Sequence, residues 1–378
     1  FVVAEGGSWS GLLAGGYGND TFSVLNGFAG QIDGDSGTDQ VIGPDSNNDW
    51  LVTTTGIGTL NAQVPFREVE SLIGGSLDDT FTFQTGGSVS GLVDGGEGLD
   101  VLDYSQMTYP VTVELQRAAA TYTGGIAGFE SFLGSSAVDH RLYAPEYVPN
   151  EWLITGENTG TLNSEGSDEV VFDGFRYLRG GRVTDRFLVQ SGGSVTGTVY
   201  GYASNTRIEL EDRGAPITVS AGSSRGIPGV IGNFSSVRDI VALGPGNHLL
   251  TGGTSNNYWY LNANGQIGIN GTSYDGFQQI EGGTGFDRLY GPDLETTWNI
   301  DSPETGQVSY GTTVHNVVGF DALYGGSLVD TFVVAEGGSW SGLLAGGYGN
   351  DTFSVLNGFA GQIDGDSGTD QVIGPDSN

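Results

Sequence analysis

The strongest constraint on this chain is an internal repeat. Residues 1–47 return without a single change at 332–378. Identity over this many positions indicates a duplication that is recent or strongly homogenised. We therefore interpret residues 1–331 as one full period of a tandem array, and residues 332–378 as the start of the next, identical period.

The composition favours a folded, β-rich chain. Glycine accounts for 68 of the 378 residues and proline for only 11, which excludes collagen and proline-rich linkers. A hydrophobic fraction of 37% is enough for a continuous core and argues against disorder. No apolar run approaches the roughly 18 residues of a membrane span, so we expect no membrane insertion. Cysteine is absent, which removes disulfides as a source of stability.

The charge of the chain excludes some partners. The formal net charge is −33, and all twelve basic residues are arginine. Such a surface repels nucleic acid and anionic lipid, so we expect neither as a partner. We expect it to attract divalent cations, or to suit salty water in which the repulsion is screened.

Short strands joined by tight turns are the expected secondary structure, because Gly, Asn, Asp or Ser interrupts nearly every apolar run within a few positions. The recurring landmark is a six-residue turn of the form GGxxxD, or a worn version of it such as GDSGTD, followed by a short strand. It starts at positions 15, 34, 74, 95, 134, 180, 282, 325, 346 and 365, with degenerate versions at 201 and 244.

The spacing of these landmarks predicts an all-β, parallel β-solenoid. Successive landmarks lie close to one or two multiples of about 20 residues apart, and one period divides into about 16 units of about 20–21 residues. A unit this short cannot bury a hydrophobic face alone and must stack on its neighbours. Sixteen coils at the strand spacing of ~4.8 Å would advance ~77 Å per period. The crossover rule predicts a right-handed coil.

A longer motif predicts which side chains face the core. The segments 74–91, 180–197 and 325–342 align without gaps, and each contains two apolar residues separated by one position. Alternation of this kind places both on the inner face of a strand. The pairs are Phe81 and Phe83, Phe187 and Val189, and Phe332 and Val334. We also expect Trp50, Trp152, Trp259 and Trp298 in the core, with an exposed sugar-stacking platform as the alternative.

Three of the turns carry a family resemblance. GGYGNDTFS (15–23), GGEGLDVLD (95–103) and GGTGFDRLY (282–290) resemble the RTX (repeats-in-toxin) nonapeptide GGxGxDxUx. The resemblance implies a right-handed parallel β-roll that binds Ca²⁺ between successive turns through Asp carboxylates and carbonyl oxygens. RTX coils are shorter and carry a nonapeptide on both sides, whereas each unit here carries one turn. Continuous rows of Ca²⁺ are therefore not expected.

The segment 102–136 resembles parts of giant repetitive bacterial surface proteins and adhesins. This second resemblance implies an extracellular or cell-surface location.

The pair of turns at 15–20 and 34–39 is the best candidate for Ca²⁺. These turns are separated by a single predicted coil, so stacking places Asp20 near Asp39, with Asp33 and Asp35 adjacent. Neighbouring carboxylates repel, and oxygen-rich Ca²⁺ coordination would relieve that repulsion. The alternative is that these residues only cap turns. The corresponding candidates in other turns and in the second copy are Asp100, Asp287, Asp351 and Asp370.

The function predicted from the sequence is structural. We expect a rod or fibre segment of a giant extracellular bacterial repeat protein, whose partners are further copies in tandem or head to tail, with lateral bundling. A Ca²⁺-dependent adhesin that binds glycans or surfaces is the alternative. A polysaccharide-active β-helix enzyme is the third, suggested by the Asp94, Asp100 and Asp103 cluster. We expect no enzyme, because the chain has no HExxH motif and no phosphate-binding loop, and its three His residues lie in three different local contexts.

Overall fold

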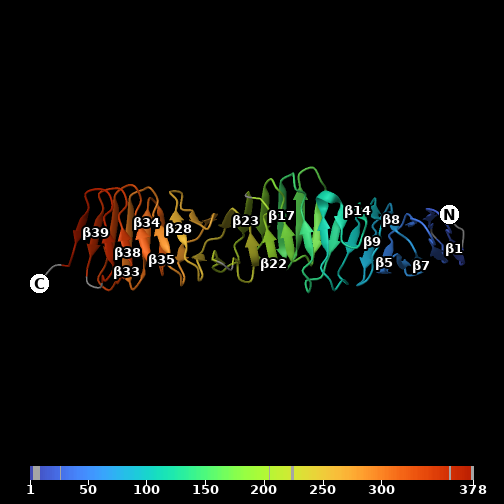
Figure 1. Cartoon of the computed structure of the whole chain (residues 1–378), viewed down its shortest axis with the longest axis horizontal. Helices are drawn as coiled ribbons and strands as arrows, with labels where there is room; N and C mark the ends of the chain where they lie inside the picture. Colours follow the sequence, from blue (N-terminus) through green and yellow to red (C-terminus); the bar gives the residue numbers. More distant parts are fainter. Residues whose placement is uncertain (3–8, 26, 204, 223–224, 357–358, 376–378) are drawn as a thin grey trace. The chain divides into compact units, whose positions relative to one another are not determined.

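The computed structural model describes the whole chain except residues 3–8, 26, 204, 223–224, 357–358 and 376–378. It divides into two compact units. Unit 1 comprises residues 1–187 and 192–203, and unit 2 comprises residues 188–191 and 204–378. Both consist of short strands (Figure 1). The one helix in the described ranges is a single 3₁₀ turn, η1 (Leu115–Arg117), so no helix there could span a membrane.

Unit 1 contains three sheets. The first is parallel throughout, in the order β2 (Thr21–Ser23), β4 (Gln40–Ile42), β8 (Ser71–Gly75), β10 (Leu92–Gly96), β14 (Gly125–Ala127). The third runs β13 (Ala119–Ala120), β12 (Thr112–Glu114), β16 (Arg141–Tyr143), β20 (Tyr177–Arg179), β22 (Val195–Tyr200).

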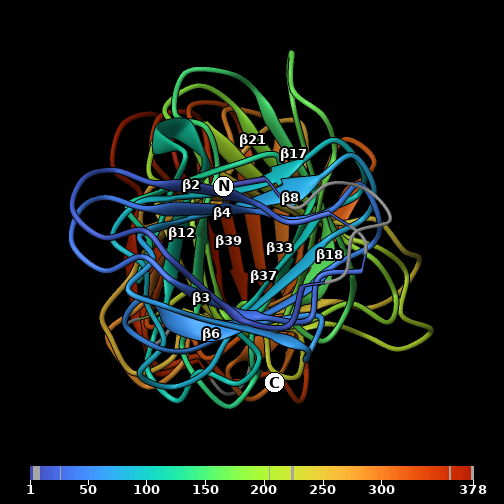
Figure 2. The ribbon, with the colours of Figure 1, turned by 90° about the vertical axis from the view of Figure 1, so that its right-hand side faces the viewer.

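The second sheet of unit 1 lies across the core from the first, as Figure 2 shows for β3 and β6 against β2 and β4. Its strands follow the order β1 (Leu12–Ala14), β3 (Gln31–Asp33), β7 (Val64–Arg67), β6 (Ile57–Leu60), β5 (Asp49–Thr54), β9 (Thr80–Phe83), β11 (Val101–Asp103), β15 (Ser131–Leu133), β19 (Val170–Asp173), β18 (Thr159–Ser164), β17 (Asn150–Gly156), β21 (Asp185–Val189).

Unit 2 contains two long sheets. One runs β23 (Thr206–Leu210), β26 (Asp239–Ala242), β30 (Thr272–Asp275), β29 (Ile267–Ile269), β28 (Tyr258–Leu261), β32 (Arg288–Tyr290), β36 (Ala322–Tyr324), β38 (Leu343–Ala345), β40 (Gln362–Asp364). The other runs β24 (Thr218–Ser220), β27 (Leu249–Thr251), β31 (Gln279–Glu281), β35 (Thr313–Val318), β34 (Thr305–Tyr310), β33 (Thr296–Ser302), β37 (Asp330–Val334), β39 (Thr352–Val355), β41 (Gln371–Ile373). Unit 2 also contains β25 (Ile231–Ser235).

Apolar side chains form in-register rows in the core. In the first sheet of unit 1 one buried row crosses all five strands: Phe22, Val41, Leu72, Val93 and Ile126. Successive members lie one strand spacing apart, so each covers the next along the stack. The predicted inward pairs, such as Phe81 and Phe83, are completely buried, which confirms the alternation expected for the long motif.

The four tryptophans predicted to lie in the core do so. Trp50, Trp152, Trp259 and Trp298 are at most 1% exposed. Trp50 stacks on Phe81 at 5.3 Å between ring centroids, and Trp298 stacks on Phe332 at 5.7 Å. Each Trp therefore extends an apolar row of the core rather than a surface platform.

The antiparallel strands were not predicted from the sequence. Each of these Trp residues lies in the first strand of a three-stranded meander: β5–β6–β7, β17–β18–β19, β28–β29–β30 and β33–β34–β35. In unit 1, β4 pairs directly with β8, so the chain between them adds its three strands to the second sheet. The missed signal is the turn chemistry, for example TGIGT at 55–59 and NANGQ at 262–266.

The expectation of an all-β fold rich in parallel strands is confirmed. The coil length is not uniform, because the step from Asp20 to Asp39 spans 19 residues and the step from Asp39 to Glu70 spans 31. A closed, right-handed solenoid stays a prediction.

Identical residues differ in burial according to their neighbours. Trp9 is 49% exposed, whereas Trp340 at the same position of the second copy is 2% exposed. Strand β38 of the second copy is paired on both sides, with β36 and β40. Its counterpart β1 has β3 as its one partner strand among the described residues. Burial of this sequence is therefore supplied by adjacent strands.

Candidate functional site

The recurring geometry of the interior is a set of polar columns at the strand starts. In each column the residue at or just before the start of one strand donates its backbone N–H to the side chain at the start of the next. In unit 1, Asp20 donates to Asp39 at 2.7 Å, and Asp39 donates to Glu70 at 2.7 Å. We call this set, Asp20, Asp39 and Glu70, the first column.

A second column of unit 1 precedes strands β5, β9, β11 and β15. Asn48 donates to Asp79 at 2.7 Å, Asp79 donates to Asp100 at 2.7 Å, and Asp100 donates to Glu130 at 2.9 Å. Each donor N–H lies in a turn, where the ladder of the sheet offers it no carbonyl, so the carboxylate satisfies a buried backbone group.

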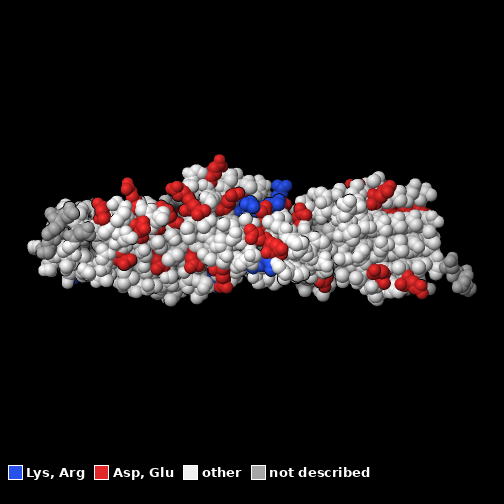
Figure 3. Space-filling model, turned by 180° about the vertical axis from the view of Figure 1, so that it is seen from behind, with Lys and Arg blue, Asp and Glu red and all other residues white. Residues whose placement is uncertain are grey.

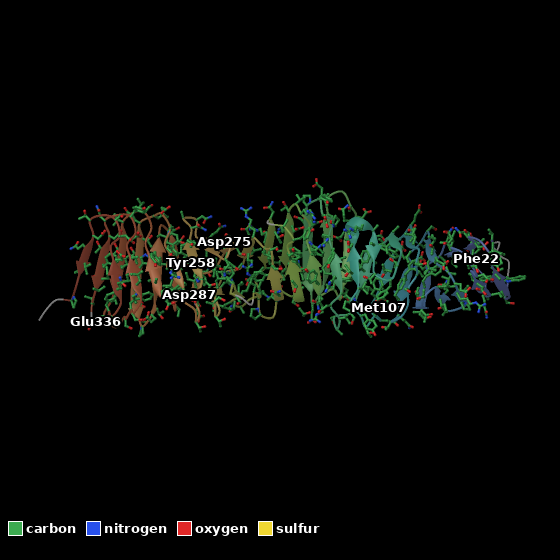
Figure 4. All side chains as sticks on the ribbon, in the orientation of Figure 1. Phe22, Met107, Tyr258, Asp275, Asp287 and Glu336 are labelled. Carbon is green, nitrogen blue, oxygen red and sulfur yellow. The ribbon has the colours of Figure 1, made fainter. Side chains whose placement is uncertain are left out.

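Unit 2 contains two more columns of the same kind. In the third, Asn257 donates to Asp287 at 3.0 Å and Asp287 donates to Asp321 at 2.8 Å; Asp287 is labelled in Figure 4. In the fourth, Asp330 donates to Asp351 at 2.8 Å and Asp351 donates to Asp370 at 3.0 Å. The same arrangement therefore recurs in both units.

The columns explain the spacing in the GGxxxD turn. The Asp carboxylate folds back over the first glycine of its own turn, so a Cβ on Gly15 would lie 2.6 Å from Asp20 Oδ2 and from the carbonyl oxygen of Gly34. The first glycines of the turns at 74, 95, 325 and 346 are enclosed in the same way by the Asp of their own turn and a backbone carbonyl of the adjacent turn in the stack. No other residue fits this position without moving the backbone.

The buried carboxylates are incompletely satisfied. In Asp39 and Asp100 one oxygen accepts the column bond, while the other is buried and lacks a hydrogen-bond partner among the described residues. Burial without a counter-charge disfavours the ionised form. Burial accordingly raises the pKa of Asp100 and of Asp330 to about 6. It also raises the pKa of Asp79, Asp287 and Asp351.

The structure brings together some of the residues predicted to bind metal. Asp20 and Asp39 are neighbours in the first column, and Asp351 and Asp370 are neighbours in the fourth. Asp100 and Asp287 belong to the second and third columns, each with different partners.

Asp33 and Asp35 lie outside the columns. Asp33 is buried and forms an ion pair with Arg67, and the hydrogen bond from that guanidinium holds the pKa of Asp33 below its usual value. Asp35 is exposed and donates its N–H to Asp33 at 3.3 Å. Across the described ranges, no three or more carboxylates or imidazoles are grouped as ligands for a metal ion. Calcium binding at the Asp20–Asp39 pair stays a prediction.

Several column-like residues were missed by sequence reasoning. His140 accepts the N–H of Val111 at 3.1 Å through Nδ1, and His248 accepts the N–H of Ile217 at 3.0 Å. Burial lowers the pKa of His140, which favours the neutral ring that can accept this bond. The available signal was position. Like most of the Asp residues in the columns, five further residues stand directly before a strand: Asn48, Glu70, Glu130, His140 and His248.

The glycine packing can be tested with two variants in adjacent strands of the first sheet. A Cβ on Gly95 in β10 would clash with the Gly128 carbonyl and lie 2.6 Å from Asp100 Oδ2. A Cβ on Gly125 in β14 would find its nearest atoms at 3.7 Å. We expect Gly95→Ala to lower the free energy of unfolding by about 1–3 kcal/mol, measured by urea unfolding. Gly125→Ala is the control and should stay within about 0.5 kcal/mol of the parent; equal losses would contradict the packing role.

The raised pKa values of the buried carboxylates predict that the free energy of unfolding falls as pH rises above about 4. The pKa of Asp100 is about 6 in the fold against 3.8 ordinarily, so the folded chain retains a proton that the unfolded chain releases between about pH 4 and 6. The free energy of unfolding should therefore fall as pH rises through that window. The Asp33–Arg67 pair affects the free energy of unfolding in the opposite direction. Its stabilising contribution is present at higher pH and is lost only as pH falls below about 4.

Replacing Asp100 by Asn tests whether the buried charge of Asp100 lowers the free energy of unfolding at neutral pH. The amide oxygen can still accept the Asp79 N–H, and no charge is buried. We expect Asp100→Asn to raise the free energy of unfolding at pH 7 by about 1–3 kcal/mol and to flatten its pH dependence. Exposed Asp49→Asn in β5 is the control. Destabilisation of Asp100→Asn at pH 7 would show that the buried charge is not unfavourable.

The calcium prediction is tested by measuring the unfolding midpoint of the parent protein in EDTA and in Ca²⁺. A bound ion would raise that midpoint in Ca²⁺, and an unchanged midpoint would contradict calcium binding.

The chain was also compared with known proteins. No family model matches the sequence, and no curated protein matches it. The function is therefore inferred from geometry.

Proposed function

We propose that this chain is a structural segment of an extracellular fibre, a parallel β-solenoid made of tandem copies of the period defined by residues 1–331. The observation that carries the proposal is that strands of the second copy continue the sheets of the first period in parallel register. Strand β38 pairs with β36, and β37 pairs with β33. A period that stacks on the next in this way is suited to continuation along an array.

The interior supports a mechanical role. Apolar rows run in register across neighbouring strands of each unit, and the polar columns tie the start of one strand to the start of the next. Strands in a column are thereby fixed to their neighbours at two levels, through the sheet ladder and through the column. Load along the stack would be shared by backbone hydrogen bonds and charge-assisted ones.

The surface supports an extracellular fibre that stays soluble. Acidic side chains are spread over the face shown in Figure 3, and the net charge is −33. Repulsion between such surfaces keeps neighbouring fibres apart at low salt and is screened at high salt. The proposed partners are therefore further copies of the same repeat, with lateral bundling favoured by salt or divalent cations.

The length of such a fibre should grow with the number of periods. We expect a protein with two complete periods to exceed one period in its maximum dimension by on the order of 80 Å, because coils add at the strand spacing. Small-angle X-ray scattering and negative-stain electron microscopy of both proteins measure this increment. A flexible string of beads, or two periods folded side by side at the length of one, would contradict the fibre.

A further inference from the structure

A row of tyrosines follows the outer face of unit 2. Tyr260 of β28, Tyr290 of β32 and Tyr324 of β36 are direct partners in the parallel register. Their rings stack at 5.1 Å between Tyr260 and Tyr290, and at 4.4 Å between Tyr290 and Tyr324, with interplanar angles of 16° and 13°. Within this stack the faces of Tyr290 are covered on both sides by rings.

The stack ends at Tyr260, whose outer ring face is uncovered. The partner of Tyr260 on the next strand, β29, is Gly268, and the partner of Gly268 on β30 is Ser273. A Cβ on Gly268 would meet only Tyr260 atoms, at 3.8 Å, so the space above this glycine is open. Tyr260 itself is 49% exposed.

The open ring face borders a hollow of about 390 Å³. Its wall on one side is Tyr260, its floor is the β29–β30 hairpin, and Arg238 lines it as well. Asp239 is the partner of Ser273 on β26, so Tyr260 and Asp239 stand three strands apart in one row, a separation of about 14 Å. The two positions between them carry Gly and Ser, which leaves room for a ring-shaped ligand.

The hairpin floor is rigid. Asn270 in its turn has a positive φ of 51° and donates its side-chain amide to Asn257 at 3.1 Å and to the Ala221 carbonyl at 3.2 Å. Arg225 donates to the Asn270 carbonyl at 3.2 Å. The hollow is therefore held open before any ligand arrives, which reduces the entropy cost of binding.

We propose that this hollow, lined by Tyr260, Gly268, Ser273 and Arg238, binds a neutral hexopyranose unit of a polysaccharide. The sugar ring would lie against the free face of Tyr260 as the next member of the stack, because the electron-rich face of an aromatic ring attracts the C–H face of a pyranose. Its hydroxyl groups both donate and accept hydrogen bonds.

The polar wall matches that requirement. Arg238 and Ser273 line the hollow, so a guanidinium supplies donors and a hydroxyl group can both donate and accept. Arg238 is already paired with Asp239 at 3.9 Å, so a phosphate or sulfate would have to compete with that carboxylate. A neutral, hydroxyl-rich ring fits the ring face and both polar groups together.

The test compares two tyrosines of the same strand. Tyr258, labelled in Figure 4, is 49% exposed like Tyr260 and lies on the same face of β28, but it does not line the hollow. Isothermal titration with cellohexaose, maltohexaose and β-1,4-galactohexaose measures binding to the full chain. We expect at least one to bind, with at least a tenfold loss of affinity in Tyr260→Ala and less than a twofold loss in Tyr258→Ala.

A second variant fills the hollow without removing the aromatic ring. Gly268→Leu places a side chain on the outer face, where the sugar would lie, and should abolish binding. Circular dichroism establishes that each variant folds. Failure of all three oligosaccharides to bind at millimolar concentration would overturn the proposal. So would equal losses in the two tyrosine variants. Binding of an anionic polysaccharide such as alginate in place of the neutral ones would also overturn it. None of these outcomes bears on fibre length.

Discussion

The interaction on which this structure most depends is the bond from a turn N–H to the carboxylate of the next strand start. Sheet ladders alone would hold strands side by side but would leave these turn amides buried and unpaired. The columns satisfy them from one strand to the next, at 2.7 Å from Asp79 to Asp100 and at 3.0 Å from Asp351 to Asp370. Because the carboxylate rests on the first glycine of its turn, the GGxxxD spacing follows from this one contact.

The columns also explain how the stack accommodates inserted chain. The step from Asp20 to Asp39 spans 19 residues, whereas the step from Asn48 to Asp79 spans 31. The meander formed by β5, β6 and β7 adds its extra strands to one sheet only, and the strand starts of the other sheet remain adjacent. The interior thus keeps its register, while hairpins alter the outer surface. The exposed face of the β28–β29–β30 meander, beside Tyr260, is such an alteration.

Much of this fold could be predicted from the sequence. The two-residue alternation in TFTF placed Phe81 and Phe83 inside, and the repeated GG turns predicted stacked short strands. The antiparallel meanders could not be predicted from landmark spacing, since a gap of two unit lengths is equally consistent with two coils. The columns were only partly visible, because Asp, Asn and Glu share the role in the structure and no single residue type marks it. The tyrosine row depends on register between strands that are distant in the sequence, which no local pattern reveals.

The most direct test of the columns is the titration of their carboxyl groups. Side-chain ¹³C NMR of the Asp-labelled protein, assigned with Asp100→Asn and Asp330→Asn, measures each pKa in the folded state. We expect the resonances lost in these two variants to titrate near pH 6, because burial without a counter-charge raises both pKa values to about 6. Titration of both groups near pH 4, as for exposed aspartates, would contradict the buried column.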